Sequence, residues 1–102
     1  MGKSEKRELS SRMAVLLSHL LKWEDQADRR AKSWTSTIGD LRKRIALALK
    51  ATPSLRASLT DADWVEEAWL DARSHARTET GLDNFPESCP WTMDQVLSVT
   101  WP

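Results

Sequence analysis

The large apolar positions of residues 33–49 recur with the period of a helix. They are Trp34, Ile38, Leu41, Ile45 and Leu49. Because these positions are three or four residues apart, they share one face of an α-helix, and Arg42, Lys43 and Arg44 fall largely off it. The pattern predicts a helix from about Asp28 to Lys50 with a basic outer face. We expect the rest of the chain to be organised around this helix.

A wider apolar stripe precedes that helix. Its members are Leu9, Met13, Leu16, Leu17, Leu20, Leu21 and Trp23. A stripe this broad indicates a helix buried against more than one neighbour, with Ser18 and Lys22 on its polar side. Residues 1–8 form a polar N-terminal segment, and Asp25 or Asp28 is expected to cap the helix that follows.

Proline and glycine divide the second half of the chain. Pro53 ends the second helix and opens a short one over residues 54–59. A third long helix is predicted to begin at a capping box of Thr60 and Asp63 and to end at Gly81. There, Leu82 is expected to fold back in a Schellman-type ending. Gly39, inside the second helix, indicates a close neighbouring backbone.

The last segment lacks periodicity until its end. Residues 82–92 contain two prolines and are read as an extended loop pinned by Phe85 and Trp91. Thr92 and Gln95 form a capping box that opens a short C-terminal helix over residues 93–99. The chain is therefore predicted to be one all-α domain, residues 1–102. We expect a small helical bundle of three long helices plus short helices, with no β-sheet.

Composition supports a folded protein with a modest core. The chain has 102 residues, 29% of them charged, and it contains six Trp but no Tyr. Buried indole rings are expected to supply much of that core. The single Cys89 excludes an internal disulfide, the N-terminus is polar, and no apolar run approaches the roughly 20 residues of a membrane span. These features predict a cytoplasmic protein.

The net charge of zero conceals a split between the two halves of the chain. Residues 1–50 carry a net charge of +6 and residues 51–102 carry −6. We expect the acidic half to dock against the basic half. The alternative is a basic face left open to an acidic partner.

His75 and Glu79 form the sharpest local pair of chemical groups. Their i, i+4 spacing places both on one face of the third helix, as a metal-binding or acid–base pair requires. A metal site needs further ligands, and only His19 and Cys89 offer other soft ones. The favoured interpretation is a hydrogen-bonded structural pair in which Arg29 or Arg30 reaches Glu79. We therefore predict no cofactor, no metal and no catalytic residue.

Two other features suggest alternative roles. The candidate binding residues Arg42, Lys43 and Arg44 share a helix with Trp34, and basic and aromatic groups together suit nucleic acid. A solvated basic face is favoured, with Trp34 in the core. Cys89 precedes a helix start that would lower a thiol pKa, but a packed, inert cysteine is favoured.

Several ordered motifs resemble a known family. They are SEKREL, LLSHLLKW, RRAKSW followed by TI, TPSLR, ARTETGL and FPESCPWTMDQVL. Together they are similar to the bacterial family catalogued as domain of unknown function 29, and the likeness runs from about Gly2 to Pro102. The resemblance implies an all-helical fold. It implies no activity and no site residue, because the family has none that can be carried over.

One departure from the family affects the expected surface. Members usually have an additional N-terminal portion with an aromatic-rich helix and an acidic helix, and this chain begins where that portion would end. We expect its absence to expose parts of the two apolar stripes and to favour self-association as a symmetric helical dimer. The sequence thus favours a non-catalytic protein-interaction or structural module. Nucleic-acid binding by the second helix and an enzyme or metal site at His75 and Glu79 are the alternatives.

Overall fold

The computed structural model describes residues 2–26, 28, 30–99 and 101 and is helical over most of them. Three long α-helices, α1, α2 and α3, span Gly2–Asp25, Lys32–Ala51 and Ala62–Thr80. A 3-10 helix, η2 (Pro53–Thr60), and a short helix, α4 (Met93–Leu97), complete the element order. The described residues contain no β-strand, so the all-α prediction is confirmed. None of the described helices has the length and apolarity needed to cross a bilayer.

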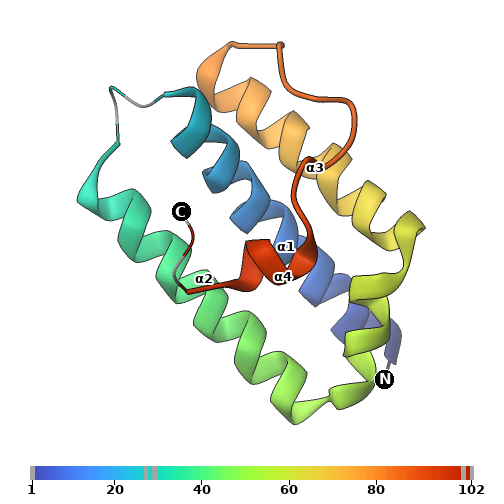
Figure 1. Cartoon of the computed structure of the whole chain (residues 1–102). Helices are drawn as coiled ribbons and strands as arrows, with labels where there is room; N and C mark the ends of the chain where they lie inside the picture. Colours follow the sequence, from blue (N-terminus) through green and yellow to red (C-terminus); the bar gives the residue numbers. More distant parts are fainter. Residues whose placement is uncertain (1, 27, 29, 100, 102) are drawn as a thin grey trace.

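Helix α1 lies at the centre of the fold, between α2 and α3 (Figure 1). Its apolar stripe is almost completely buried, from Leu9 at 1% exposure to Leu21 at 4%. Ser18 and Lys22, which we expected on a polar side, are buried as well, because α1 has neighbours on both flanks. The predicted burial against more than one element is therefore confirmed. The central helix, however, is α1 and not the predicted α2.

The polar segment of residues 1–8 is part of α1 from Gly2 onward. Glu5 lies in the first turn, where a negative charge interacts favourably with the helix dipole. One turn later, Glu8 and Arg12 form an i, i+4 ion pair with an O–N distance of 2.6 Å. These local interactions favour helix in a segment that has few apolar residues.

Helix α2 begins four residues later than predicted. Its N-cap is Ala31, which makes no side-chain capping bond, whereas both predicted caps precede the helix. The turn is held instead by Arg30, whose Nε donates to the Trp23 carbonyl over 2.8 Å and whose guanidinium lies 4.6 Å from the Trp23 ring centroid. This cation–π contact spans the turn between α1 and α2.

The buried face of α2 consists of Ile38, Arg42, Ile45 and Leu49. Three of these residues belong to the predicted stripe, but Trp34 is only half-buried and lies outside the core cluster. Arg42, expected on the outer face, is 7% exposed. Most residues of the two apolar stripes are thus buried within the chain, whereas Trp23, Trp34 and Leu41 are half-buried. Little of the exposed stripe surface that we expected to favour a symmetric dimer is found.

The capping of α3 differs from the prediction by one residue. Asp61 is the N-cap, and its Oδ1 accepts hydrogen bonds from the backbone N–H groups of Asp63 and Trp64 over 3.0 and 3.4 Å. Thr60, the predicted cap, closes η2 instead by donating its hydroxyl to the Ala57 carbonyl. Because η2 runs through Thr60, only Asp61 has the extended backbone that an N-cap needs.

Helix α3 ends at Gly81, as predicted, in the left-handed conformation with φ 75°. The Gly81 N–H donates to the Arg77 carbonyl over 2.9 Å, the single bond of an αL motif. The Leu82 N–H donates to the Thr80 hydroxyl, and the Leu82 side chain is 38% exposed. The prediction of a Schellman-type ending, with Leu82 folded back against the helix, is therefore wrong.

Substitution by alanine is expected to change the stability of the fold in opposite directions at Gly81 and Gly39. Gly81→Ala should lower the free energy of unfolding by about 1 kcal/mol, because a side chain is strained at positive φ. Gly39→Ala should raise it by about 1 kcal/mol, because Gly39 is helical and a Cβ there meets nothing within 4 Å. The close backbone expected at Gly39 is thus absent. Urea unfolding of both variants checks the prediction, and a loss of stability in Gly39→Ala would contradict it.

The C-terminal segment crosses over the layer of long helices (Figure 1). Phe85 is buried, as predicted, and the Trp69 indole of α3 donates its N–H to the Pro86 carbonyl over 3.0 Å. Trp91 packs edge-on against Trp69, with ring centroids 5.7 Å apart. The Thr92 hydroxyl accepts from the Gln95 N–H over 3.1 Å, as the capping box predicted. Helix α4 itself ends two residues early, at Leu97.

Candidate functional site

His75 and Glu79 lie on the exposed side of α3, and Glu79 takes part in a bridge between the long helices. Its carboxylate accepts a hydrogen bond and forms an ion pair with Lys22 of α1. The Lys22 ammonium also lies 5.7 Å from the centroid of the Trp34 ring on α2. The bridge therefore joins three helices.

The described partner of Glu79 is Lys22 and not the predicted Arg30. Arg30 is engaged with Trp23, and Arg29 lies outside the described residues. Lys22 carries the role because α1 lies next to α3, which no local pattern reveals. The hydrogen bond from Lys22 lowers the pKa of Glu79, burial partly opposes this, and the Lys22, His19 and His75 charges add to the lowering. Glu79 is thus an ionised, engaged carboxylate at neutral pH and a poor general acid.

The arrangement around His75 lacks the ligands of a metal site. Across the part of the chain that the structure describes, no three His, Cys, Asp or Glu side chains come together as a metal ion requires. The His19 ring bonds the Val15 carbonyl through Nδ1 over 2.9 Å. Cys89, the remaining soft candidate, lies in the segment before α4.

Replacing Glu79 by glutamine should reveal the Lys22 pair through its pH dependence. At neutral pH we expect a loss of about 1 kcal/mol, kept small because the Glu79 side chain is 54% exposed. The folded-state pKa of Glu79 lies below its ordinary value of 4.5, so this contribution is complete above that value. It is lost as the pH falls through the lowered pKa. Urea unfolding from neutral to acidic pH checks this, and a difference from wild type that persists unchanged in acid would contradict it.

Arg42 is a structural residue rather than a surface ligand. Its Nε donates to the Val96 carbonyl over 2.9 Å, and a second guanidinium nitrogen donates to the Trp101 carbonyl. Burial lowers its pKa. No described carboxylate lies within ion-pair distance of it, so the two backbone carbonyls are its partners here. Arg42 thereby holds the C-terminal segment onto α2, and of the three predicted binding residues only Lys43 and Arg44 remain on the surface.

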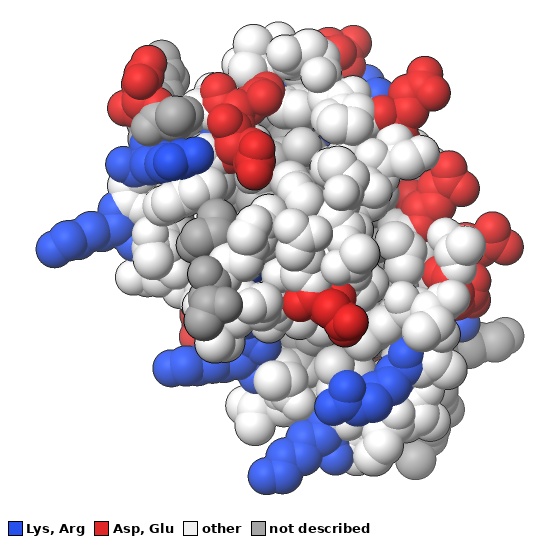
Figure 2. Space-filling view, in the orientation of Figure 1, with Lys and Arg blue, Asp and Glu red and all other residues white. Residues whose placement is uncertain are grey.

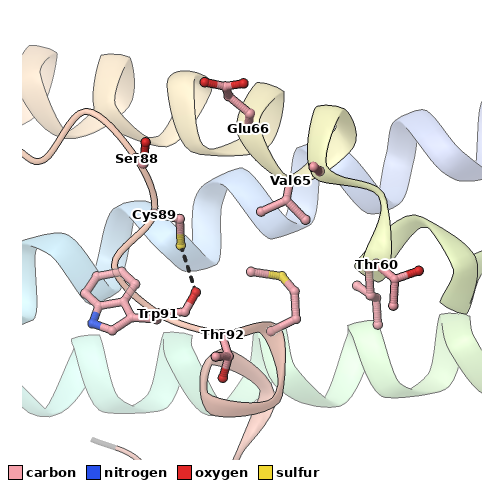
Figure 3. A pocket seen from close by; sticks show the side chains of 10 residues that line it. Thr60, Val65, Glu66, Ser88, Cys89, Trp91 and Thr92 are labelled. Atoms are coloured by element: carbon pink, nitrogen blue, oxygen red, sulfur yellow. Dashed lines mark hydrogen bonds between the residues drawn. The ribbon is translucent and has the colours of Figure 1, made fainter.

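A hollow of about 400 Å³ opens between η2, the start of α3 and the segment before α4 (Figure 3). Figure 3 shows Thr60 and Val65 on one side and Cys89 and Trp91 on the other. The Cys89 thiol donates to the Trp91 carbonyl over 3.4 Å, and burial raises its pKa. A raised pKa keeps the thiol protonated at neutral pH, which agrees with the packed cysteine favoured by the sequence. Neither His75 nor Glu79 lines this hollow.

Many charged side chains of the two halves lie on different parts of the surface. Figure 2 shows acidic side chains along the flank of α3 and basic side chains towards α2. Among the described residues, only the Lys22–Glu79 ion pair joins the basic half to the acidic half, and the other three ion pairs are local. The predicted docking of opposite charges is therefore limited to one pair, and two charged surfaces remain exposed.

Each charged surface has an exposed leucine near its centre. We call Lys43, Arg44, Leu47 and Lys50 the basic face of α2, where Asp40 pairs with Arg44. The acidic face of α3 is Asp63, Glu66, Glu67, Leu70 and Asp71, which Arg73 borders. Leu47 is 65% exposed and Leu70 is 50% exposed. The sequence analysis missed both leucines, and Leu47 falls outside the apolar stripe of residues 33–49. Their positions amid charges of mostly one sign are the signal that was available.

Comparison with known proteins identifies the family of the chain. No curated protein and no solved structure matches it. One family does match, over residues 1–102, and it is described as "Domain of unknown function DUF29". This match agrees with the family resemblance of the sequence motifs. The chain therefore belongs to the family described as domain of unknown function DUF29.

Proposed function

We propose that the chain is a non-catalytic helical module that binds protein through the charged faces of its outer helices. The observation that carries the proposal is the exposure of Leu47 and Leu70, each within a surface of predominantly one charge sign. An apolar contact with a charged rim is the usual anatomy of a protein interface. The proposal keeps the cytoplasmic location that the sequence predicts.

The chemistry of the interior supports a binding role over a catalytic one. The titratable groups with shifted pKa values each have a structural partner: Glu79 bonds Lys22, Arg42 bonds two carbonyls, and Cys89 bonds Trp91. A catalytic pair needs a nucleophile or acid within reach of a base, and these three groups are engaged elsewhere. The outer faces are what the fold leaves available to a partner.

Nucleic-acid binding by α2 is the alternative, and it draws less support. Arg42 is buried, and Trp34 is covered on one side by the Lys22 ammonium. The remaining cations of the face are Lys43, Arg44 and Lys50, of which Arg44 already pairs with Asp40 over 3.0 Å. The face thus retains phosphate-binding charges but lacks an aromatic side chain on which a base would stack.

The experiment compares an immobilised wild-type chain with the variant Lys43→Glu/Lys50→Glu in a nuclease-treated lysate of the source organism. Lys6→Glu/Arg7→Glu is the matched control, since it makes the same change of charge at exposed positions of α1. We expect the wild type and the control to retain the same proteins and the α2 variant to lose them. Retention that does not depend on the face would overturn the proposal. Binding to mixed DNA that weakens with salt would favour the alternative.

A further inference from the structure

The two charged faces repeat one pattern with opposite signs. On α2, the exposed Lys43 and Arg44 precede the exposed Leu47 by four and three residues. On α3, the exposed Glu66 and Glu67 precede the exposed Leu70 by the same four and three residues. Residues at these spacings are neighbours on a helix surface. Each face thus contains an exposed leucine and, one helical turn closer to the helix N-terminus, two side chains of the same charge.

The match between the faces points to a second copy of the chain as the partner. Building on the proposed function, we propose that the basic face of α2 in one copy binds the acidic face of α3 in the next. Leu47 then contacts Leu70, while Lys43 and Arg44 lie beside Glu66 and Glu67. The leucine contact removes apolar surface from water, and the charges select the partner face and its register.

The register also fixes the orientation of neighbouring copies. On both helices the charged pair precedes the leucine. When the two leucines are in contact, the basic pair can therefore lie beside the acidic pair only if α2 and the α3 of the neighbouring copy run parallel. Within one chain α2 and α3 run in opposite directions on either side of α1 (Figure 1). Each copy is therefore rotated by about half a turn relative to the next. Because the contact joins two different faces, it is heterologous and repeats along an open chain of copies.

Sedimentation velocity tests the association directly. We expect the wild-type chain to form species larger than a monomer as its concentration rises to about 1 mM at low salt. About 0.5 M salt should weaken the association at least several-fold, because it screens exposed charges beyond about 4 Å. A wild-type chain that stays monomeric at low salt throughout this range would overturn the inference.

Charge reversal identifies the faces. Lys43→Glu/Arg44→Glu and Glu66→Lys/Glu67→Lys should each remove the association, because each brings like charges together. The variant carrying all four substitutions should associate again, whereas Lys6→Glu/Arg7→Glu should behave as wild type. Circular dichroism confirms that each variant is folded. A fourfold variant that is folded but monomeric, beside a wild type that associates, would overturn the pairing.

A disulfide experiment fixes the register. In a Cys89→Ser background, mixing Leu47→Cys with Leu70→Cys should give a cross-linked heterodimer under mild oxidation, and neither variant alone should cross-link efficiently. A cross-link formed as fast by Leu47→Cys alone would indicate a symmetric contact and overturn the head-to-tail arrangement. If the chain does not self-associate, the lysate experiment still tests the proposed binding of another protein. A different protein retained through the α2 face would then uphold the proposed function alone.

Discussion

Replacing Trp69 by alanine is expected to lower the free energy of unfolding by about 3–5 kcal/mol. Trp69 is fully buried at 0% exposure, its ring packs edge-on against Trp91, and its N–H donates to the Pro86 carbonyl. The substitution removes the largest fully buried side chain and leaves a cavity beneath the C-terminal segment. Such a loss is a large part of the roughly 5–15 kcal/mol that stabilises a typical domain. Urea unfolding followed by circular dichroism measures it.

Trp34→Ala is the matched control for this experiment. Trp34 is half-buried and lies outside the core cluster, where it contacts the Lys22 ammonium. We expect a loss of about 1 kcal/mol, from the cation–π contact and part of the ring's burial. The comparison also tests where the core lies. Equal losses at the two positions would contradict a core centred on α1 and α3.

Replacing Arg42 by methionine is expected to cost about 2–4 kcal/mol. Methionine keeps an apolar stem in place, but the carbonyls of Val96 and Trp101 lose their charged donor. Removing a buried charge offsets part of this cost, since that charge is desolvated in the folded chain. Because Arg42 holds the C-terminal segment, the loss should be accompanied by local loosening of that segment.

Hydrogen exchange distinguishes this local effect from a general loss of stability. In Arg42→Met, the amide of Val96, which donates to the Thr92 carbonyl, should exchange faster than the amides of the α1 core. Arg44→Met is the control, because Arg44 is exposed and pairs only locally with Asp40. It should cost less than about 0.5 kcal/mol. Unchanged exchange at Val96 in Arg42→Met would contradict the role of Arg42.

Features with a local cause could be predicted from the sequence. The first two long helices follow from apolar periodicity, the third from its capping region and Gly81, and the start of α4 from Thr92. In each case neighbouring residues alone satisfy the backbone groups. Where two local solutions compete, as at Thr60 and Asp61, the sequence identified the capping region but not the capping residue.

Features that depend on which helices are neighbours could not be predicted. Ser18, Lys22 and Arg42 are polar residues on predicted outer faces, yet all three are buried. Lys22 is buried because Glu79 and Trp34 reach it from two other helices, and Arg42 because the C-terminal segment covers it. Periodicity assigns one inner face to a helix, whereas these helices are covered on more than one side.

The candidate site shows the same division. The i, i+4 spacing correctly placed His75 and Glu79 on one helix, but the partner of Glu79 comes from residue 22 of another helix. Of the basic candidates, Lys43 and Arg44 remain exposed and Arg42 does not. The interior thus uses its charged groups to join helices. The outer faces of α2 and α3 carry exposed charged side chains and an exposed leucine each.

Amide chemical shifts of the ¹⁵N-labelled chain, followed as the concentration rises from about 20 μM to about 1 mM at low salt, test the central claim most directly. If the outer faces bind as we propose, shift changes will cluster around Leu47 on α2 and Leu70 on α3. They will fade when salt is added. Changes centred on α1 or on the hollow beside Cys89, or no changes at all, would contradict the claim that a second copy binds at the two charged faces.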